Sequence, residues 1–504
     1  MRLHDFHGGL ALPGHAEVSL AVPLADAGLP ERVYVPIGQH QGEAGAVLVE
    51  AGEIVAAGQA LTASEDDFEV PAHAPCSGTV IGVCHRPASS PPGSQRRCVE
   101  ILPDRKENRV AATPLEDWQQ RPPGDIIGHL RTMGLVGLGG AMFPTAAKLR
   151  GPWPAIDTLI LNGAECEPWI SCDQALMQTR PEAVVNGGLV LAQATGARRI
   201  IIAVEDDMAG VAAGLAKALP GSNNGPEIRV VEVPAVYPQG GERQLIETLT
   251  GRQVPRDGLP QDIGLLCHNV ATAAAAFDAV ENGRPLTERI VTVTGPGIAH
   301  PRNLRAAIGT PIAHLVLQAG GYHDDVQRLI LGGPMSGTAL TTDEVVLTKG
   351  SHCVLALTSA EFAPRPEPMP CINCGECVAA CPAGLMPQLL FRALSGDRHE
   401  QARELSLLEC IECGCCAQVC PSHIPLVDYY RHGKARLRQA DLDQRRAALA
   451  RRRHEARQER LAKQQAQRQA RRRARAERLE KAELARDEIQ AAIERAKAKK
   501  RTRE

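Results

Sequence analysis

The chain has 504 residues, 44% of them hydrophobic and only 3% aromatic, so it is long enough for three or more domains with aliphatic cores. Its net charge of −2 hides an asymmetry, because about 26 Lys and Arg but about 11 Asp and Glu follow residue 430. No run approaches the ~18–20 uninterrupted apolar residues of a membrane span, and the first residues lack the apolar core of a signal peptide. We therefore expect a soluble multidomain chain.

Residues 33–83 have the pattern of short strands separated by Gly and Pro. The segments 45–61 and 70–83 resemble the two halves of biotinyl/lipoyl-type sandwich domains, which carry a modified lysine at the tip between the halves. The tip here, Thr62-Ala-Ser-Glu-Asp-Asp67, contains no lysine. We therefore expect a barrel-sandwich-hybrid (lipoyl-like) domain within residues 1–110 that serves as a structural docking module.

Alternating strands and helices follow and predict an α/β domain at residues 111–285. Residues 158–161 and 199–204 are strand-like, whereas 181–197 and 208–219 have helical patterns.

A glycine-rich loop, Gly134-Leu-Val-Gly137-Leu-Gly139-Gly140-Ala-Met142, precedes Lys148 in this domain. Met142 replaces the last glycine of G-x-G-x-x-G, and no G-K-[ST] follows. The backbone amides of such a loop can still approach a phosphate closely, but by itself the loop fits a tight packing turn equally well.

Residues 286–350 predict a small β-rich module, with strands near 290–294 and 329–331 and one helix at about 304–319 between them. The segment 364–370, Pro-Arg-Pro-Glu-Pro-Met-Pro, predicts a stiff linker.

Two cysteine strings follow the linker, and each has the spacing C-x₂-C-x₂-C-x₃-C-P by which bacterial ferredoxins hold cubane clusters. In such pairs the fourth cysteine of each string ligates the other cluster. The spacing therefore predicts two [4Fe–4S] clusters in residues 360–432. The ligand sets are Cys371, Cys374, Cys377 and Cys420 for one cluster, and Cys410, Cys413, Cys416 and Cys381 for the other. Residues 386–393 and 400–408 predict a helical insertion between the strings.

Zinc and disulfides explain these cysteines less well. Zinc sites use paired C-x₂-C knuckles with a longer gap and need only four ligands, and disulfide frameworks are typical of short secreted chains. Cys415 lies inside the second string, but the register selects Cys416, so we expect Cys415 to be a spectator. The other cysteines are scattered, which together with clusters that need thiolates indicates the reducing cytoplasm.

Residues 433–504 consist mainly of Arg, Ala, Glu, Gln, Lys and Leu, with too few leucines for a coiled-coil seam. We expect an intermittent solvated helix or disorder. A charged tail without specific chemistry, contact with anionic lipid and nucleic-acid binding stay open, the last least favoured because no recognition module accompanies the charge.

Four segments resemble, in order, the flavin and NADH motifs of the NADH-binding subunit of respiratory complex I. They are G-L-G-G-A-M-F-P-T at 137–145, N-G-A-E-C-E-P at 162–168, G-G-E-R-Q-L-I-E at 240–247 and H-N-V-A-T at 268–272. The β-rich module then falls where that family has its β-grasp (SLBB-like) domain. Two positions depart from the family, since Leu138 replaces an arginine and Ala164 an acidic residue.

This resemblance implies an FMN site with NADH as substrate. The cofactor-binding residues that it implies are Gly137, Gly139, Gly140, Lys148, Asn162, Gly240, Gly241, Asn269 and Thr272. The catalytic residues that it implies, near the flavin and nicotinamide, are Glu165, Glu167 and Glu242.

Residues 1 to about 435 also resemble the RnfC/RsxC family, the C subunits of the Rnf (Rsx) electron transport complexes. The resemblance extends from F-H-G-G at 6–9 through Y-P-Q-G-G-E at 237–242 to the double cysteine run. It implies a peripheral subunit on the cytoplasmic face of the bacterial inner membrane. Its partners would be the iron–sulfur B subunit and the membrane subunits of an ion-translocating complex, through which the chain would meet the membrane surface.

The expected function is electron transfer between NADH and those partners. NADH gives up two electrons at once, whereas a cubane cluster accepts one. A flavin can take the pair from NADH and pass the electrons on singly. Two alternatives are a soluble NADH-diaphorase subunit of a hydrogenase or formate dehydrogenase, and a non-catalytic electron-relay scaffold with a vestigial nucleotide site.

Overall fold

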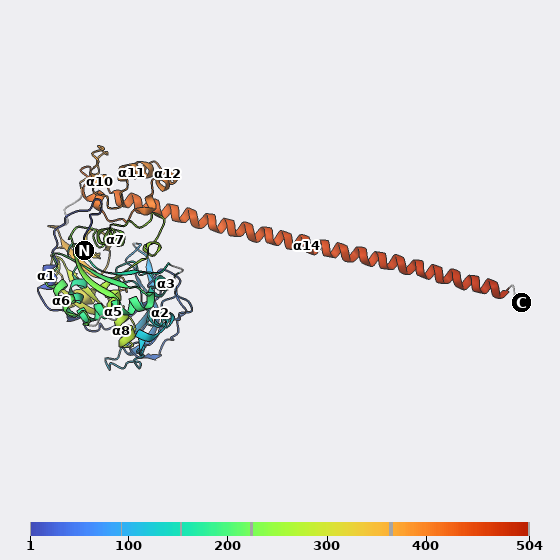
Figure 1. The fold of residues 1–504 in the computed structure, drawn as a ribbon, viewed down its shortest axis with the longest axis horizontal. Helices are drawn as coiled ribbons and strands as arrows, with labels where there is room; N and C mark the ends of the chain where they lie inside the picture. The colour runs from blue at the N-terminus through green and yellow to red at the C-terminus, as the bar shows by residue number, and fades with distance from the viewer. Residues whose placement is uncertain (1, 92, 152–153, 222–224, 362–365, 502–504) are drawn as a thin grey trace. The chain divides into compact units, whose positions relative to one another are not determined.

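The computed structural model describes residues 2–91, 93–151, 154–221, 225–361 and 366–501 (Figure 1). The chain divides into two compact units, residues 1–430 and 431–504, and each is described by itself.

A four-stranded antiparallel sheet forms the sandwich domain of the first unit, with the order β2-β5-β4-β3. Its strands are β2 (Val33–Pro36), β3 (Ile54–Val55), β4 (Gly78–Pro87) and β5 (Gln95–Pro103). Val33, Leu61 and Ile101 lie in its core with no exposed surface. This is the lipoyl-like fold expected from the two-half pattern.

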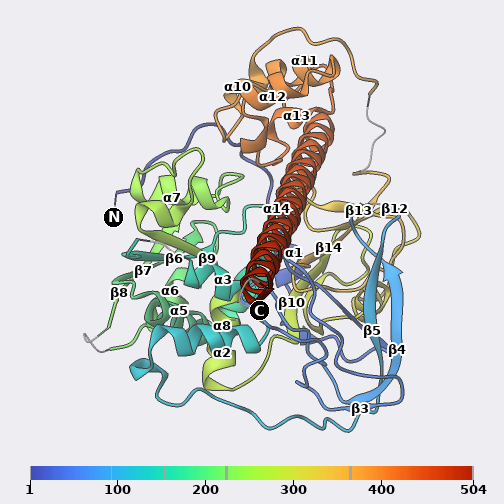
Figure 2. The same ribbon diagram turned by 90° about the vertical axis from the view of Figure 1, so that its right-hand side faces the viewer.

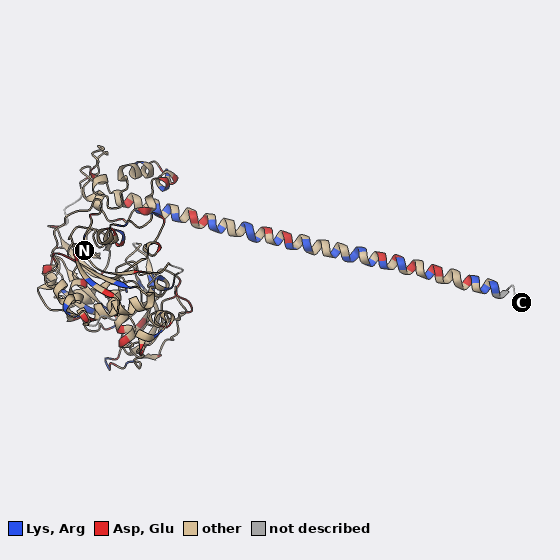
Figure 3. Cartoon of the chain, viewed as in Figure 1, with Lys and Arg blue, Asp and Glu red and all other residues tan. Residues whose placement is uncertain are grey.

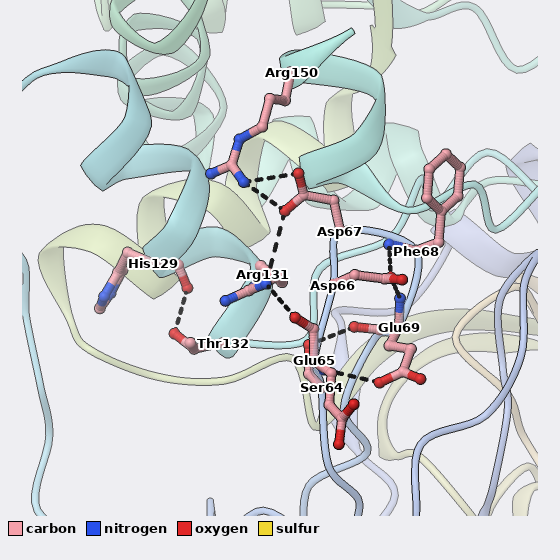
Figure 4. A network of polar contacts seen from close by, with 10 residues as sticks. All are labelled: Ser64, Glu65, Asp66, Asp67, Phe68, Glu69, His129, Arg131, Thr132 and Arg150. Carbon is pink, nitrogen blue, oxygen red and sulfur yellow. Dashed lines mark hydrogen bonds and ion pairs between the residues drawn. The ribbon is translucent and has the colours of Figure 1, made fainter. Parts of the chain in front are cut away.

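The lysine-free tip of this domain packs against the α/β domain (Figure 4). Asp67 accepts hydrogen bonds from Arg150 at 2.9 and 2.8 Å, and Arg131 lies 3.9 Å from the same carboxylate. Asp66 stays within the tip and accepts from the backbone amides of Phe68 and Glu69. The tip therefore acts as a docking surface, as the missing lysine indicated.

The α/β domain is built on a parallel sheet with the order β8-β7-β6-β9. The strands are β6 (Thr158–Gly163), β7 (Arg199–Glu205), β8 (Glu227–Val233) and β9 (Leu265–Asn269). The helices are α2 (Pro123–Thr132), α3 (Thr145–Arg150), α4 (Cys172–Thr179), α5 (Pro181–Thr195), α6 (Val211–Lys217), α7 (Glu242–Thr250) and α8 (Val270–Glu281). The 3₁₀ turns are η1 (Trp118–Gln120) and η2 (Pro260–Ile263).

Both faces of the inner strands β6 and β7 are buried, so these strands are apolar at most successive positions, whereas the edge strand β8 also carries charged residues. Helices α5 and α8 lie on one side of the sheet and α7 on the other (Figure 2). Leu159 and Leu161 belong to the core shared with α5 and α8, whereas Ile160 belongs to the core shared with α7. Helices α5 and α8 approach closely because Gly187 has no side chain, and a Cβ there would lie 1.8 Å from the carbonyl oxygen of Ala273. The predicted α/β elements are confirmed.

A six-stranded mixed sheet follows, with the order β1-β11-β10-β14-β12-β13. Its elements are β1 (Ala25–Asp26), β10 (Glu288–Thr294), β11 (Arg302–Ala307), α9 (Ile312–Gln318), β12 (Val326–Leu331), β13 (Thr338–Leu340) and β14 (Cys353–Thr358), and the short α1 (Glu17–Leu20) precedes β1.

The helix predicted at 304–319 is wrong in its first third. That part forms β11, because pairing with β10 outweighs its local helical composition, and Gly309 with a φ of +96° separates it from α9.

Between residues 366 and 425 the described cysteine region forms short helices: α10 (Glu376–Ala379), α11 (Pro387–Ser395), α12 (His399–Glu404), η3 (Leu407–Glu409) and α13 (Cys415–Gln418). Helices α11 and α12 confirm the predicted helical insertion. Residues 364–365 of the predicted proline linker lie outside the described residues, and residues 366–370 form no regular secondary structure.

Helix α14 (Leu426–Arg501) continues through the second unit (Figure 3). The expectation of an intermittent helix is therefore wrong, because Ala, Arg, Gln, Glu, Lys and Leu all have high helix propensity and no Pro interrupts them. Within the described residues, no helix is long and apolar enough to cross a bilayer.

Candidate functional site

The glycine loop lies against the first turn of α8. The amide of Leu138 donates to Thr272 Oγ1 at 2.9 Å, and a Cβ on Gly139 would lie 3.4 Å from Asn269 Cβ. Gly140 has a φ of +101° with open space at its Cβ position. A ligand can therefore approach the backbone at Gly140 closely.

Residues predicted from distant motifs meet beside this loop. Lys148 of α3 donates to Glu242 Oε1 at 2.9 Å and to the carbonyl of Cys267 at 2.6 Å. Asn162, at the end of β6, donates to the carbonyl of Gly240 at 2.8 Å. The sheet thus brings the ends of β6 and β9 and the start of α7 to the loop, as expected at the carboxyl edge of a parallel sheet.

Asp173 is a member of this site that the sequence did not predict. Its carboxylate accepts a 2.5 Å hydrogen bond from the side-chain amide of Asn269, which also caps α8 by accepting from Ala271. Burial raises the pKa of Asp173 above its ordinary value. No motif marks this aspartate, because only the packing of α4 against α8 brings it to Asn269.

Glu165 and Glu167 are engaged in structural contacts. Glu165 accepts from the backbone amides of Asp173 and Gln174, both at 3.0 Å, at the start of α4. Burial, followed by the charge of Asp173, raises the pKa of Glu165 to about 8. Glu167 accepts from the amides of Met335 and Ser336, both at 2.7 Å, in the neighbouring β-rich module. Of the three predicted catalytic acids, the structure brings only Glu242 into contact with Lys148.

The donors at the glycine loop suit a phosphorylated flavin. A backbone that can be approached at Gly140, the Lys148 ammonium and the amide side chains of Asn162 and Asn269 are the groups that bind phosphate and flavin polar atoms. The cofactor roles of the individual residues stay predictions.

Two cavities in the ferredoxin-type region each have four cysteines in their walls. Cys371, Cys374, Cys377 and Cys420 line one. Cys381, Cys410, Cys413 and Cys416 line the other. These are the two sets predicted from crossed ligation, and each presents the four thiolates that a cubane cluster needs. No disulfide forms among the 16 cysteines.

Cys415 does not line either cavity, in agreement with its expected spectator position. Its thiol is fully buried and donates to the sulfur of Cys413, which lowers the pKa of Cys413. Backbone amides also point at sulfurs of the predicted ligand sets, since Leu385 donates to Cys381 Sγ and Glu412 to Cys410 Sγ, both at 3.4 Å. Donors of this kind stabilise thiolates.

The two candidate sites are joined by direct contacts. The hydroxyl of Tyr237 donates to the carbonyl of Cys413 at 2.7 Å, and Gln244 of α7 donates to the carbonyl of Pro382 at 3.1 Å. Burial raises the pKa of Tyr237, which keeps its hydroxyl protonated. The motif that runs from Tyr237 to Glu242 therefore contacts the flavin-side residues at one end and a predicted cluster ligand at the other.

Four family models match successive parts of the chain. They are the RnfC barrel sandwich hybrid domain at residues 4–106, the Nuo51 FMN-binding domain at 130–278, the SLBB domain at 290–339 and the 4Fe-4S dicluster domain at 367–424. They support the multidomain fold and a cofactor set of two [4Fe–4S] clusters and FMN.

Curated relatives match over nearly the whole chain. The C subunit of the ion-translocating oxidoreductase complex of Pseudomonas aeruginosa is 43% identical, with 99% of this chain and 66% of the relative aligned. The protein of the same name from Serratia proteamaculans is 41% identical, over 99% of this chain and 70% of the relative. The chain belongs to this family of C subunits. It spans 58% of the Erwinia tasmaniensis member, to which it is 43% identical over 93% of its own length.

Two crystal structures of an NAD+-reducing [NiFe]-hydrogenase also align with this member of the family. Each alignment covers 63% of this chain and 65% of the matched chain. The identity is 20% and the TM-score 0.44 for the H2-reduced state, and 21% and 0.45 for the air-oxidized state.

Proposed function

We propose that this chain is an electron-transfer subunit that carries electrons between NADH and a membrane-bound ion-translocating complex. The observation that carries the proposal is the Tyr237 contact, because it joins the glycine-loop site to a cavity lined by four cysteines within one compact unit. When bound, FMN exchanges two electrons with a nicotinamide and one electron at a time with a cluster.

Lys148 and Glu242 have distinct roles in this proposal. The Lys148 ammonium neutralises a flavin phosphate, with the Asn269 amide as a neighbouring donor. Glu242, 40% exposed and hydrogen-bonded to Lys148, accepts hydrogen bonds from the incoming dinucleotide. Glu165 and Glu167 position the loop between β6 and α4 through the backbone amides that they bind.

The two cavities differ in position, so the two predicted clusters have different places in the proposed path of the electrons. Cys413, which contacts Tyr237, belongs to the set with Cys381, Cys410 and Cys416, so this set receives electrons first. Cys371 and Cys374 of the other set are exposed, and Ile372 between them is 66% exposed. Because electron transfer needs close approach, the second set is the exit toward a partner.

The partner in this proposal is the iron–sulfur B subunit of an Rnf-type complex, with the membrane subunits beyond it. The chain would then be peripheral, on the cytoplasmic face of a bacterial inner membrane. The basic second unit, with about 26 cationic and about 11 acidic residues, provides a further attraction to anionic lipid.

Cofactor analysis of anaerobically purified protein tests the proposal. We expect iron and sulfide for two cubane clusters, bound FMN and NADH-dependent dye reduction. Colourless protein would contradict it, bound clusters without flavin would favour the relay scaffold, and full activity that never co-fractionates with membranes would favour a soluble diaphorase.

Paired cysteine variants test the crossed ligand sets. Cys374→Ala and Cys420→Ala should each remove the same cluster, and Cys413→Ala and Cys381→Ala the other, with roughly half of the iron lost in each case. Cys415→Ala is the matched control and should keep both clusters. Electron paramagnetic resonance of the reduced variants distinguishes the two signals, and loss of different signals from Cys374→Ala and Cys420→Ala would overturn the assignment.

A further inference from the structure

The glycine loop presents backbone amides that the protein itself does not use. From Gly139 to Phe143, these amides make no hydrogen bond of good geometry to any residue that the structure describes. Gly139, Gly140 and Ala141 are also exposed. Successive free amides in a turn bind anions such as a phosphate, provided that the turn holds them in the right direction.

Gln41 of the sandwich domain fixes the direction of two peptide units in this loop. It lies in the segment 38–43, which follows β2. Its backbone amide donates to the carbonyl of Met142 at 3.3 Å, and its side-chain amide donates to the carbonyl of Ala141 at 3.1 Å. A trans peptide unit is planar, so each carbonyl points away from the amide that follows it. Gln41 therefore directs the amides of Met142 and Phe143 to the opposite side of the loop.

Met142 needs such support because its backbone is left-handed, with a φ of +49°. A residue other than glycine adopts this conformation only at an energetic cost, and the surrounding structure has to compensate for it. The Met142 side chain packs on Gly350, where a Cβ would lie 2.7 Å from its sulfur. The amide of the adjacent Lys349 donates to Gln39 Oε1 at 2.9 Å. The sandwich domain and the β-rich module thus hold this turn together.

The tip of the sandwich domain contacts the residues that follow. Phe68 packs edge-on against Phe143, with ring centroids 6.3 Å apart. Asp67 binds Arg150 at the end of α3, as described above (Figure 4). The contacts of the sandwich domain therefore extend from the glycine loop along the helix that the loop precedes.

We propose that Gln41 is a positioning residue of the flavin site, through which the sandwich domain makes the site selective for a phosphorylated flavin. Its two hydrogen bonds orient the loop amides before the ligand arrives, so the phosphate does not have to order them. Riboflavin has no phosphate and gains nothing from this order. Gln41 acts through the loop and needs no contact with the flavin. The inference rests on the proposed function, because it concerns the same flavin site.

Gln41→Met tests this role, since it keeps the length of the side chain and the backbone amide but removes the side-chain donor. Flavin fluorescence quenching measures binding to the full-length, flavin-free protein. The affinity for FMN should fall about fivefold, the effect of one neutral hydrogen bond, whereas the affinity for riboflavin should stay the same.

Hydrogen exchange of the flavin-free protein gives a second readout. It should become faster at the amides of Gly137 and Leu138, which donate to Phe143 and Thr272. The unfolding midpoint in urea should not change, because Gln41 is exposed.

The matched control is Gln95→Met, which replaces an exposed glutamine of β5 in the same domain. It should change neither flavin affinity nor exchange. Equal FMN affinity in Gln41→Met and Gln95→Met, or an equal loss of FMN and riboflavin affinity in Gln41→Met, would overturn the inference and leave the proposed function standing. A native chain that binds no FMN would instead overturn the proposed function, and this inference with it.

Discussion

Lys349 is an ionisable side chain that is almost completely buried. It is 1% exposed, and its amino group donates to the carbonyls of Gly134 and Pro71 at 2.7 and 3.1 Å. Gly134 belongs to the α/β domain and Pro71 to the sandwich domain. One side chain of the β-rich module therefore links these three parts of the chain by hydrogen bonds. The arrangement holds the turn that begins the glycine loop, and the proposed flavin site therefore depends on this residue indirectly.

Burial lowers the pKa of Lys349 to about 7, whereas an unfolded lysine has a pKa of about 10.4. Between these values the unfolded chain binds a proton that the folded chain lacks, so the contribution of Lys349 to stability rises with pH. The difference in unfolding free energy between the native chain and Lys349→Met should increase from pH 7 to pH 9, by at most about 1.4 kcal/mol per pH unit.

Urea unfolding followed by tryptophan fluorescence under anaerobic conditions measures this difference. Lys217→Met, which removes an exposed lysine of α6, is the control. The charge of Lys349 also lowers the pKa of the nearby His40 and His73. Well above the ordinary histidine pKa of about 6.5 both rings are neutral in the folded and the unfolded chain, so they add little to the change between about pH 7.5 and pH 9. A difference that does not change with pH would show that Lys349 titrates in the folded chain as it does in the unfolded one.

At the scale of elements, the N-terminal segment fastens the ferredoxin-type region to the α/β domain. The amide of His4 donates to the carbonyl of Thr248 in α7, that of Gly9 to the carbonyl of Ala380, and Leu10 exchanges backbone hydrogen bonds with Tyr237. The segment thus crosses the contact through which electrons are proposed to pass. Its stability should set how firmly the two sites are held together.

Gly8→Ala should loosen this segment. Gly8 has a φ of +75°, and a Cβ there would lie 2.8 Å from the backbone of Ala380 and Cys381. A left-handed backbone and overpacking together cost about 2–4 kcal/mol. Hydrogen exchange should become faster at Ala380 and Tyr237 in this variant, whereas Gly14→Ala, whose Cβ meets nothing within 4 Å, should leave it unchanged. Equal exchange in both variants would contradict the fastening role.

Some elements followed from the sequence and others required the fold. Strands β6 and β7 were predicted because both of their faces are buried and most of their residues are apolar. Strand β8 was not predicted, because it lies at the edge of the sheet and charged residues interrupt its apolar ones. Strand β11 was predicted as part of a helix, since only its pairing with β10 opposes a helical composition. Cysteine spacing predicted the two cavities, but the Tyr237–Cys413 contact joins residues 176 positions apart, and no local pattern encodes it.

At the scale of the whole molecule, the two units obtain their stability in different ways. The first unit buries several apolar cores, whereas every described side chain from residue 442 to 499 is exposed. The second unit must therefore rely on helix propensity and on pairs of charges three or four residues apart, such as Asp443 and Arg446 at 3.8 Å. A helix of this kind has no packed core to make its melting cooperative.

A peptide of residues 440–500 should consequently be helical alone and should lose helicity gradually on heating, as circular dichroism would show. Ala466→Gly and Ala470→Gly together should lower its helicity, since each costs about 1 kcal/mol, while Ala466→Gln and Ala470→Gln should change it little. In the full chain the glycine pair should leave the unfolding midpoint of the first unit unchanged. A sharp melting transition of the peptide, or a shifted midpoint in the full chain, would show that the helix is stabilised by packing, because propensity alone gives neither result.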